Sequence, residues 1–177
     1  MGGNIMDIKL FAAFWTDIMD EIPGKKAFQK LVYFGQVLGI PFKQPYRMHY
    51  FGPYSDSVAR ELSRALEQKI VIQEQGYKFG TGETAKTYLE DCYDDVHSNI
   101  DNLTTLIEYF GDMGPMDLEL YATTHYVDNN QKRLYGNYDK QSIIDKIKEI
   151  KGTKFTIEDI ETAYNQLDEW DLLTQHD

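Results

Sequence analysis

The first forty residues repeat apolar side chains every three or four positions, which is the period of one buried face of a helix. In residues 7–20 the apolar stripe consists of Phe11, Phe14, Trp15 and Ile18. In residues 25–38 the stripe consists of Phe28, Leu31, Val32 and Leu38, and the pattern leaves outward Lys26, Gln29 and Lys30. Gly39, Pro41 and Pro45 then favour an extended loop. The pattern therefore predicts two helices followed by a loop.

Residues 46–79 change from a helical to a strand-like pattern and back. The aromatic-rich stretch 46–51 predicts a short strand. A turn is expected to follow at Gly52, Pro53 and Tyr54, and Ser55 is a suitable N-cap for a helix over residues 56–68. Residues 69–74 and 77–79, joined through Gln75 and Gly76, predict a two-stranded ribbon.

The second half of the chain is predominantly helical in its pattern. Apolar spacing predicts helices over residues 92–110, 116–127, 143–150 and 157–170. The polar tract 128–142 contains several turn-forming residues and predicts a mobile surface loop. Thr156 and Asp159 have the spacing of a capping box at the start of the last helix.

This order of elements defines the expected fold class. We expect a mostly helical α+β protein with a winged helix-turn-helix-like core, a small antiparallel sheet and a C-terminal helical extension. Residues 1–90 would form the winged-helix-like module with its N-terminal helix, and residues 91–177 an acidic helical extension packed on that module.

Charge is distributed unevenly along the chain. Residues 1–90 carry a net charge of +1 and residues 91–177 carry −12, within a total of −11 for 177 residues. A weakly basic module beside an acidic remainder makes nucleic-acid binding worth considering. The favoured interpretation is that the acidic helices only keep the protein in solution. Since there is one cysteine, Cys92, and no apolar run near the roughly 20 residues of a membrane helix, we expect a cytoplasmic protein without membrane contact.

Candidate catalytic groups do not form a recognisable constellation. Residues 80–87 approximate a phosphate-binding loop, but Ala85 stands where that motif requires glycine. The four histidines are scattered singly, without zinc-ligand spacing. Cys92 has no histidine at a spacing known for a nucleophile. The sequence therefore gives no support for an enzyme, a metal site or a cofactor.

Four segments carry a family resemblance. The segments KKAFQKLVYF, MHYFGPYSDSVARELSRALEQKIV, LELYATTHYV and KFTIEDIETAYNQL together resemble the YwgA-like family of small bacterial proteins, over nearly the whole chain. The first two motifs, QKLVYF and GPYS, also resemble the Panacea antitoxin domain, although the chain departs from that pattern after residue 90.

The resemblance implies a winged-helix-like core with added helices and no established catalytic activity. The Panacea relation would further imply neutralisation of a toxin by direct protein contact, in a bacterium or phage. The motif residues are interpreted as structural, orienting one helix and building the turn before the next: Gln29, Lys30, Tyr33, Gly52, Pro53, Tyr54 and Ser55.

Two functions follow as hypotheses. The first is a non-catalytic module that binds an unidentified protein partner, as an antitoxin, anti-defence factor or adaptor, with Tyr135 and Tyr138 of the expected loop as contact residues. The alternative is a DNA-binding regulator that uses helix 56–68. Its candidate nucleic-acid face, equally a candidate partner face, consists of Lys25, Lys26, Lys30, Arg60 and Arg64. A homodimer is compatible with either hypothesis.

Overall fold

The computed structural model describes residues 4–176 and divides the chain into two compact units. The first ends at Pro115 and the second begins at Met116. Residues 91–115, which the sequence assigned to the C-terminal extension, therefore pack in the first unit. The class is α+β, mostly helical, with small antiparallel sheets.

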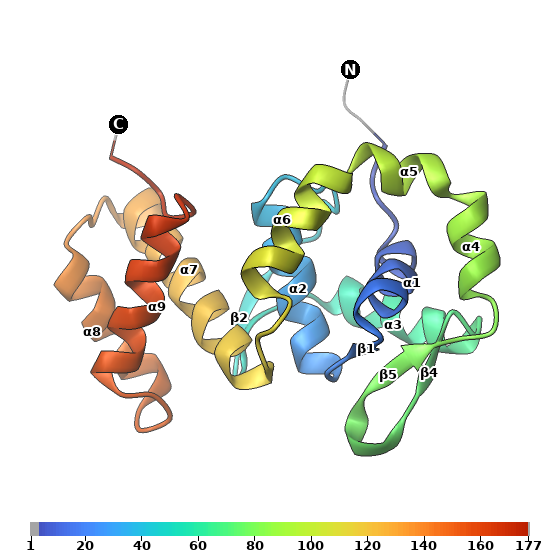
Figure 1. Ribbon diagram of the computed structural model, residues 1–177. Helices are drawn as coiled ribbons and strands as arrows, with labels where there is room; N and C mark the ends of the chain where they lie inside the picture. The colour runs from blue at the N-terminus through green and yellow to red at the C-terminus, as the bar shows by residue number, and fades with distance from the viewer. Residues whose placement is uncertain (1–3, 177) are drawn as a thin grey trace. The chain divides into compact units, whose positions relative to one another are not determined.

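The first unit contains six helices and two sheets among its described residues (Figure 1). Its elements are α1 (Ile8–Met19), β1 (Glu21–Ile22), α2 (Lys25–Val37), β2 (Arg47–His49), β3 (Gly52–Tyr54), α3 (Asp56–Glu67), β4 (Val71–Gln73), the 3-10 turn η1 (Gln75–Tyr77), β5 (Phe79–Thr81), α4 (Ala85–Asp91), α5 (Tyr93–Ser98) and α6 (Ile100–Phe110).

Aromatic side chains from α1 and α2 form the centre of the first unit. The Phe11 ring on α1 lies 5.9 Å from the ring of Phe28 on α2 and 5.2 Å from that of Phe42. Phe34 of α2 stacks on Phe110 of α6 at 4.0 Å between ring centroids. Because α4 packs on α1 and α6 packs on α2, the three helices α4 to α6 follow an arc beside the core (Figure 1).

The three-stranded sheet has the order β1-β5-β4, with both pairs antiparallel. A ribbon was predicted with strands at 69–74 and 77–79, and in the structure its second strand, β5, lies at Phe79–Thr81. The strand β1 was not predicted. β1 pairs Glu21 with Gly80 and Ile22 with Phe79, so it owes its conformation to a partner far along the chain. A strand of two residues is too short to show the alternation of apolar and polar side chains from which a strand is predicted.

The second sheet corrects the prediction for residues 46–54. The turn lies at Tyr50 and Phe51, and Gly52–Tyr54 is the strand β3, which pairs with β2. Pro53 is tolerated because it sits opposite Met48 in a two-stranded sheet, where its missing N–H can face away from the partner strand. The motif glycine, proline and tyrosine therefore form one arm of a hairpin rather than its turn.

As far as residue 176, the second unit is built from three helices: α7 (Pro115–Tyr135), α8 (Lys140–Lys151) and α9 (Ile157–Glu169). Helix α7 continues through most of the tract that was predicted to be a loop, leaving only residues 136–139 between α7 and α8. Asp128 and Lys132, both buried, form an ion pair of 2.8 Å at i,i+4 spacing, which stabilises this part of the helix.

Two further predictions were wrong in detail. The predicted helix 92–110 is divided into α5 and α6 at Asn99, whose side-chain amide donates to the Asp95 carbonyl at 2.8 Å. Ile18, assigned to the buried stripe of α1, is 53% exposed. By contrast, the caps were read correctly: Ser55 caps α3, and Thr156 with Asp159 forms the capping box of α9.

Candidate binding groove between α2 and α3

Helix α2 is buried along most of its length, which corrects the prediction that Gln29 and Lys30 face outward. Gln29 is 4% exposed and Lys30 is 1% exposed. The Gln29 amide donates to the Ser55 carbonyl and accepts from the Ser55 N–H, both at 2.9 Å. The Lys30 ammonium donates to the Pro53 carbonyl at 3.0 Å. The motifs QKLVYF and GPYS, which also resemble the Panacea domain, are therefore hydrogen-bonded to each other.

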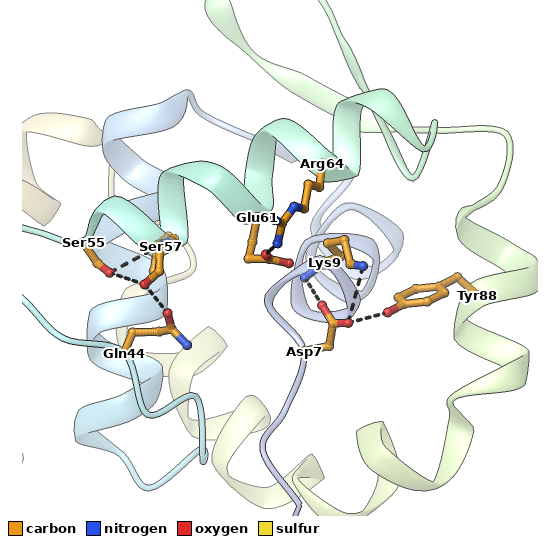
Figure 2. A network of polar contacts seen from close by, with 9 residues as sticks. Asp7, Lys9, Gln44, Ser55, Ser57, Glu61, Arg64 and Tyr88 are labelled. Carbon is orange, nitrogen blue, oxygen red and sulfur yellow. Dashed lines mark hydrogen bonds and ion pairs between the residues drawn. The ribbon is translucent and has the colours of Figure 1, made fainter.

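A second glutamine repeats this contact two turns along α2. The Gln36 amide donates to the Gln44 carbonyl at 3.0 Å and accepts from the Gln44 N–H at 2.8 Å. The Gln44 side chain in turn accepts from the Ser57 hydroxyl, which also bonds Ser55, as Figure 2 shows. These contacts tie α2 to the start of α3 and to the loop before β2.

Beside these contacts lies a groove of about 360 Å³, with walls from α2, α3 and the β2–β3 hairpin. Most of its lining is apolar or aromatic. The lining residues are Lys25, Lys26, Phe28, Gln29, Lys30, His49, Phe51, Tyr54, Ala59, Leu62, Ser63 and Leu66. The volume and the mixture of apolar walls with a few polar groups are those of a ligand or anchor-residue pocket.

The hairpin supplies an aromatic edge to this groove. Lys26 Nζ lies 4.6 Å from the centroid of the Phe51 ring, a cation–π contact that joins α2 to the hairpin tip. The His49 ring stacks on Tyr54 at 4.8 Å. Next to Phe51, the Tyr50 side chain is 78% exposed. Exposed aromatic side chains beside an apolar groove are typical of protein-binding surfaces.

The structure separates the residues of the predicted face. Lys25, Lys26 and Lys30 line the groove. Arg60 instead lines a smaller hollow together with Arg47 and Tyr46. Arg64 is exposed and forms an ion pair with Glu61 on its own helix (Figure 2). The two arginines therefore do not line the groove that the three lysines line.

The two tyrosines predicted to contact a partner lie in the second unit. Tyr135 is 72% exposed at the end of α7. Tyr138 is half-buried, with its ring 4.3 Å from the ring of His176. Tyr138 thus packs within its own unit. Tyr135 is exposed, as a residue that contacts a partner has to be.

Asp7 and His125, two titratable groups outside the groove, take part in hydrogen bonds between segments far apart in the sequence. Figure 2 shows Asp7, at the start of α1, accepting a hydrogen bond of 2.8 Å from the Tyr88 hydroxyl of α4. Burial and nearby carboxylates, chiefly that of Asp95, raise the pKa of the Cys92 thiol, which opposes formation of a nucleophilic thiolate. Burial lowers the pKa of His125 to about 4, and its Nε2 bonds the Leu172 carbonyl at 3.0 Å.

Within residues 4–176, no cluster of three or more His, Cys, Asp or Glu side chains is arranged to hold a metal ion. In the same range, no helix has both the length and the apolar character needed to cross a membrane.

Sequence comparison adds a relative without a described activity. No protein-family model matches the chain. Over 117 residues, 61% of this chain and 67% of the relative, it is 26% identical to the uncharacterized protein YwgA of Bacillus subtilis (strain 168). This similarity supports a YwgA-like family, in agreement with the motif resemblance.

Sequence reasoning missed the groove because it placed the relevant side chains on separate elements. Phe51 falls in the predicted strand 46–51, and Leu62 and Leu66 fall in the predicted helix 56–68. Nothing local indicated that these three residues line one cavity. The one available signal was the pair of adjacent aromatics at a hairpin tip, Tyr50 and Phe51, since large aromatic residues in a tight turn are not explained by turn chemistry.

Proposed function

We propose that this protein is a non-catalytic binding module that docks a protein partner in the groove between α2 and α3. The observation that carries the proposal is an apolar groove of about 360 Å³ bordered by the exposed aromatic tip of the β2–β3 hairpin. Such a surface suits an antitoxin, an anti-defence factor or an adaptor, each of which acts by contact alone.

Hydrogen bonds from α2 support the walls of the groove. Gln29 and Lys30 hold the backbone of residues 53–55 by three hydrogen bonds of 2.9–3.0 Å. Their polar groups are thereby engaged in positioning the groove walls. A preformed surface binds with less loss of conformational entropy than a flexible one.

Site-specific photo-crosslinking tests this function. A benzoylphenylalanine placed at Tyr50, 78% exposed at the hairpin tip, should crosslink to a discrete protein in cells of the source organism. The matched control is the same probe at Tyr93, which is 62% exposed on α5. The proposal fails when position 50 gives no adduct, or gives the same adducts as position 93.

DNA binding is the second candidate, and the order of elements favours it. Helices α1, α2 and α3 with the strand order β1-β5-β4 match the arrangement of a winged-helix domain, in which α3 would enter the major groove and the β4–β5 ribbon would be the wing. The hairpin β2–β3 would then replace the usual turn between α2 and α3.

Electrostatics weigh against this second candidate. On α3, Arg64 is paired with Glu61, and Asp56 lies 3.3 Å from the Arg47 guanidinium. The helices α4 to α6 of the same unit contain several exposed carboxylates and only one lysine, Lys86. A mobility shift of duplex DNA that weakens with salt, and that Arg60→Glu with Arg64→Glu removes, would establish DNA binding.

A further inference from the structure

We infer that the occupant of the groove is an acidic amphipathic segment of the partner, whose apolar side chains enter the groove while its carboxylates meet Lys25 and Lys26. This inference rests on the proposed function, because it specifies the partner chemistry of the same groove.

The first argument is the charge of the lining. Three of the described lining residues are lysines and none is Asp or Glu. The whole chain has 29 acidic and 18 basic residues, so a lining of this composition departs from the average of the molecule. Opposite charge on the occupant would raise the association rate and exclude basic competitors.

The second argument is that helix stability does not account for these lysines. Lys25 and Lys26 occupy the first turn of α2, where the backbone dipole disfavours positive charge. The N-cap, Gly24, provides no side-chain hydrogen bond, and the first turn has no acidic residue. Two lysines at this position weaken the helix slightly, and a carboxylate on a bound segment would offset that effect.

The third argument concerns the size of the occupant. The apolar surface continues from Phe51 in the groove to the adjacent Tyr50, which stands out from the hairpin tip. A small amphiphile would fill the cavity and leave Tyr50 in water. A peptide segment covers both, with one or two large side chains as anchors and the remainder lying along the hairpin.

Selection from a random peptide library displayed on phage, with the full-length protein as bait, tests the inference. The enriched peptides are expected to combine Leu, Phe or Trp with several Asp or Glu. Affinity of the strongest peptide is then measured by fluorescence anisotropy. Lys25→Glu with Lys26→Glu should weaken it at least about tenfold. Ser63→Trp, which covers the groove from an exposed position of α3, should weaken it similarly.

The matched control is Arg60→Glu with Arg64→Glu, because it makes the same change in net charge on exposed residues of α3 that do not line the groove. This double variant should change affinity less than about twofold. The Lys25→Glu and Lys26→Glu variant should also melt close to the parent protein, because the favourable position of glutamate in the first turn of α2 offsets the lost Lys26–Phe51 contact. Loss of binding would then not reflect unfolding.

Four results would overturn the inference, three from the peptide experiments and one from crosslinking. The first is enrichment of peptides without acidic residues, and the second is an acidic peptide whose affinity does not change in the two groove variants. The third is an empty selection together with self-association of the protein, which would make a second copy the occupant. In the fourth result, a protein crosslinks from position 50 and also binds the Lys25→Glu, Lys26→Glu variant as well as it binds the parent protein. The proposed function would then stand, and the inference that the bound segment is acidic would be wrong.

Discussion

The side-chain amide of Gln29 bonds both the N–H and the C=O of Ser55, each at 2.9 Å, across 26 residues of sequence. Ser55 is the N-cap of α3, so this contact fixes where α3 begins relative to α2. The separation of the two helices sets the width of the groove. One buried amide therefore links a sequence motif to the shape of the candidate site.

Gln29→Met should destabilise the first unit by about 2–4 kcal/mol, because the buried N–H and C=O of Ser55 both lose their partner. Methionine fills a similar volume, so the loss of hydrogen bonds dominates over a cavity. Urea unfolding followed by Trp15 fluorescence measures the effect, since Trp15 is buried in this unit.

Gln36→Met provides the comparison for this substitution. It removes the equivalent pair of hydrogen bonds to Gln44 in a half-buried place, where water can replace them. The expected cost is about 1 kcal/mol. Equal losses for the two variants would show that burial of the Gln29 contact contributes nothing.

The sequence could predict the elements that depend on local chemistry. Helices α1, α2 and α3 followed from apolar spacing, and the caps at Ser55 and Thr156 followed from hydroxyl side chains at the right positions. These signals lie within a few residues of the structures that they specify.

Features that depend on distant partners could not be predicted in this way. Polar residues such as Gln29 and Lys30 are ordinarily exposed, and only the backbone of residues 53–55 makes their burial favourable. Likewise β1 exists because β5 lies beside it. The groove depends both on local helix formation and on contacts between distant segments. Its lysines could therefore be named as candidates from the sequence, whereas the apolar residues that form its walls could not.

Gly82→Ala should disrupt the junction between the β4–β5 ribbon and α4. A Cβ at this position would lie 2.0 Å from the backbone carbonyl oxygen of Lys69, and backbone cannot rotate away as a side chain can. The expected cost is about 3 kcal/mol, the upper range for an overpacked site. Thermal unfolding measures it.

Gly76→Asn is the control in the same ribbon. Among the described residues other than Gly76 and its two chain neighbours, no heavy atom lies within 4 Å of the position that a Cβ would take at Gly76. Asparagine tolerates the φ of +74° at this position better than most residues. A loss below about 1 kcal/mol is expected. If the Gly82 and Gly76 variants unfold at the same temperature, the steric explanation for Gly82 is wrong.

Glu119→Gln should destabilise the second unit by about 3–5 kcal/mol. The fully buried Glu119 carboxylate accepts from Lys151 at 3.1 Å and from Lys154 at 2.9 Å. Its removal leaves the Lys151 ammonium buried without its opposite charge. Hydrogen exchange of α7 and α8 amides should accelerate. Glu61→Gln, which breaks an exposed pair with Arg64, should cost less than about 1 kcal/mol.

Acidification should destabilise the second unit through His125. Its pKa is about 4 in the folded protein because burial disfavours the charged ring, and Lys132 and Arg133 act in the same direction. In the unfolded chain the histidine has its ordinary pKa of about 6.5, so the unfolded chain binds the proton first as the pH falls. Stability is accordingly constant above about pH 6.5 and decreases by roughly 3 kcal/mol as the pH approaches 4.

Between about pH 6.5 and 5, the titration of histidine can be observed apart from that of carboxylates, which titrate at about pH 4 in unfolded chains. Hydrogen exchange of α7 and α9 amides as a function of pH, corrected for intrinsic rates, reports this stability. His125→Gln retains a donor for the Leu172 carbonyl and should abolish the slope in that interval. His97→Gln lies in the first unit and should leave it unchanged. If the His125→Gln variant shows the same slope as the parent protein, another group causes the pH dependence, because this variant no longer has the imidazole that would bind the proton.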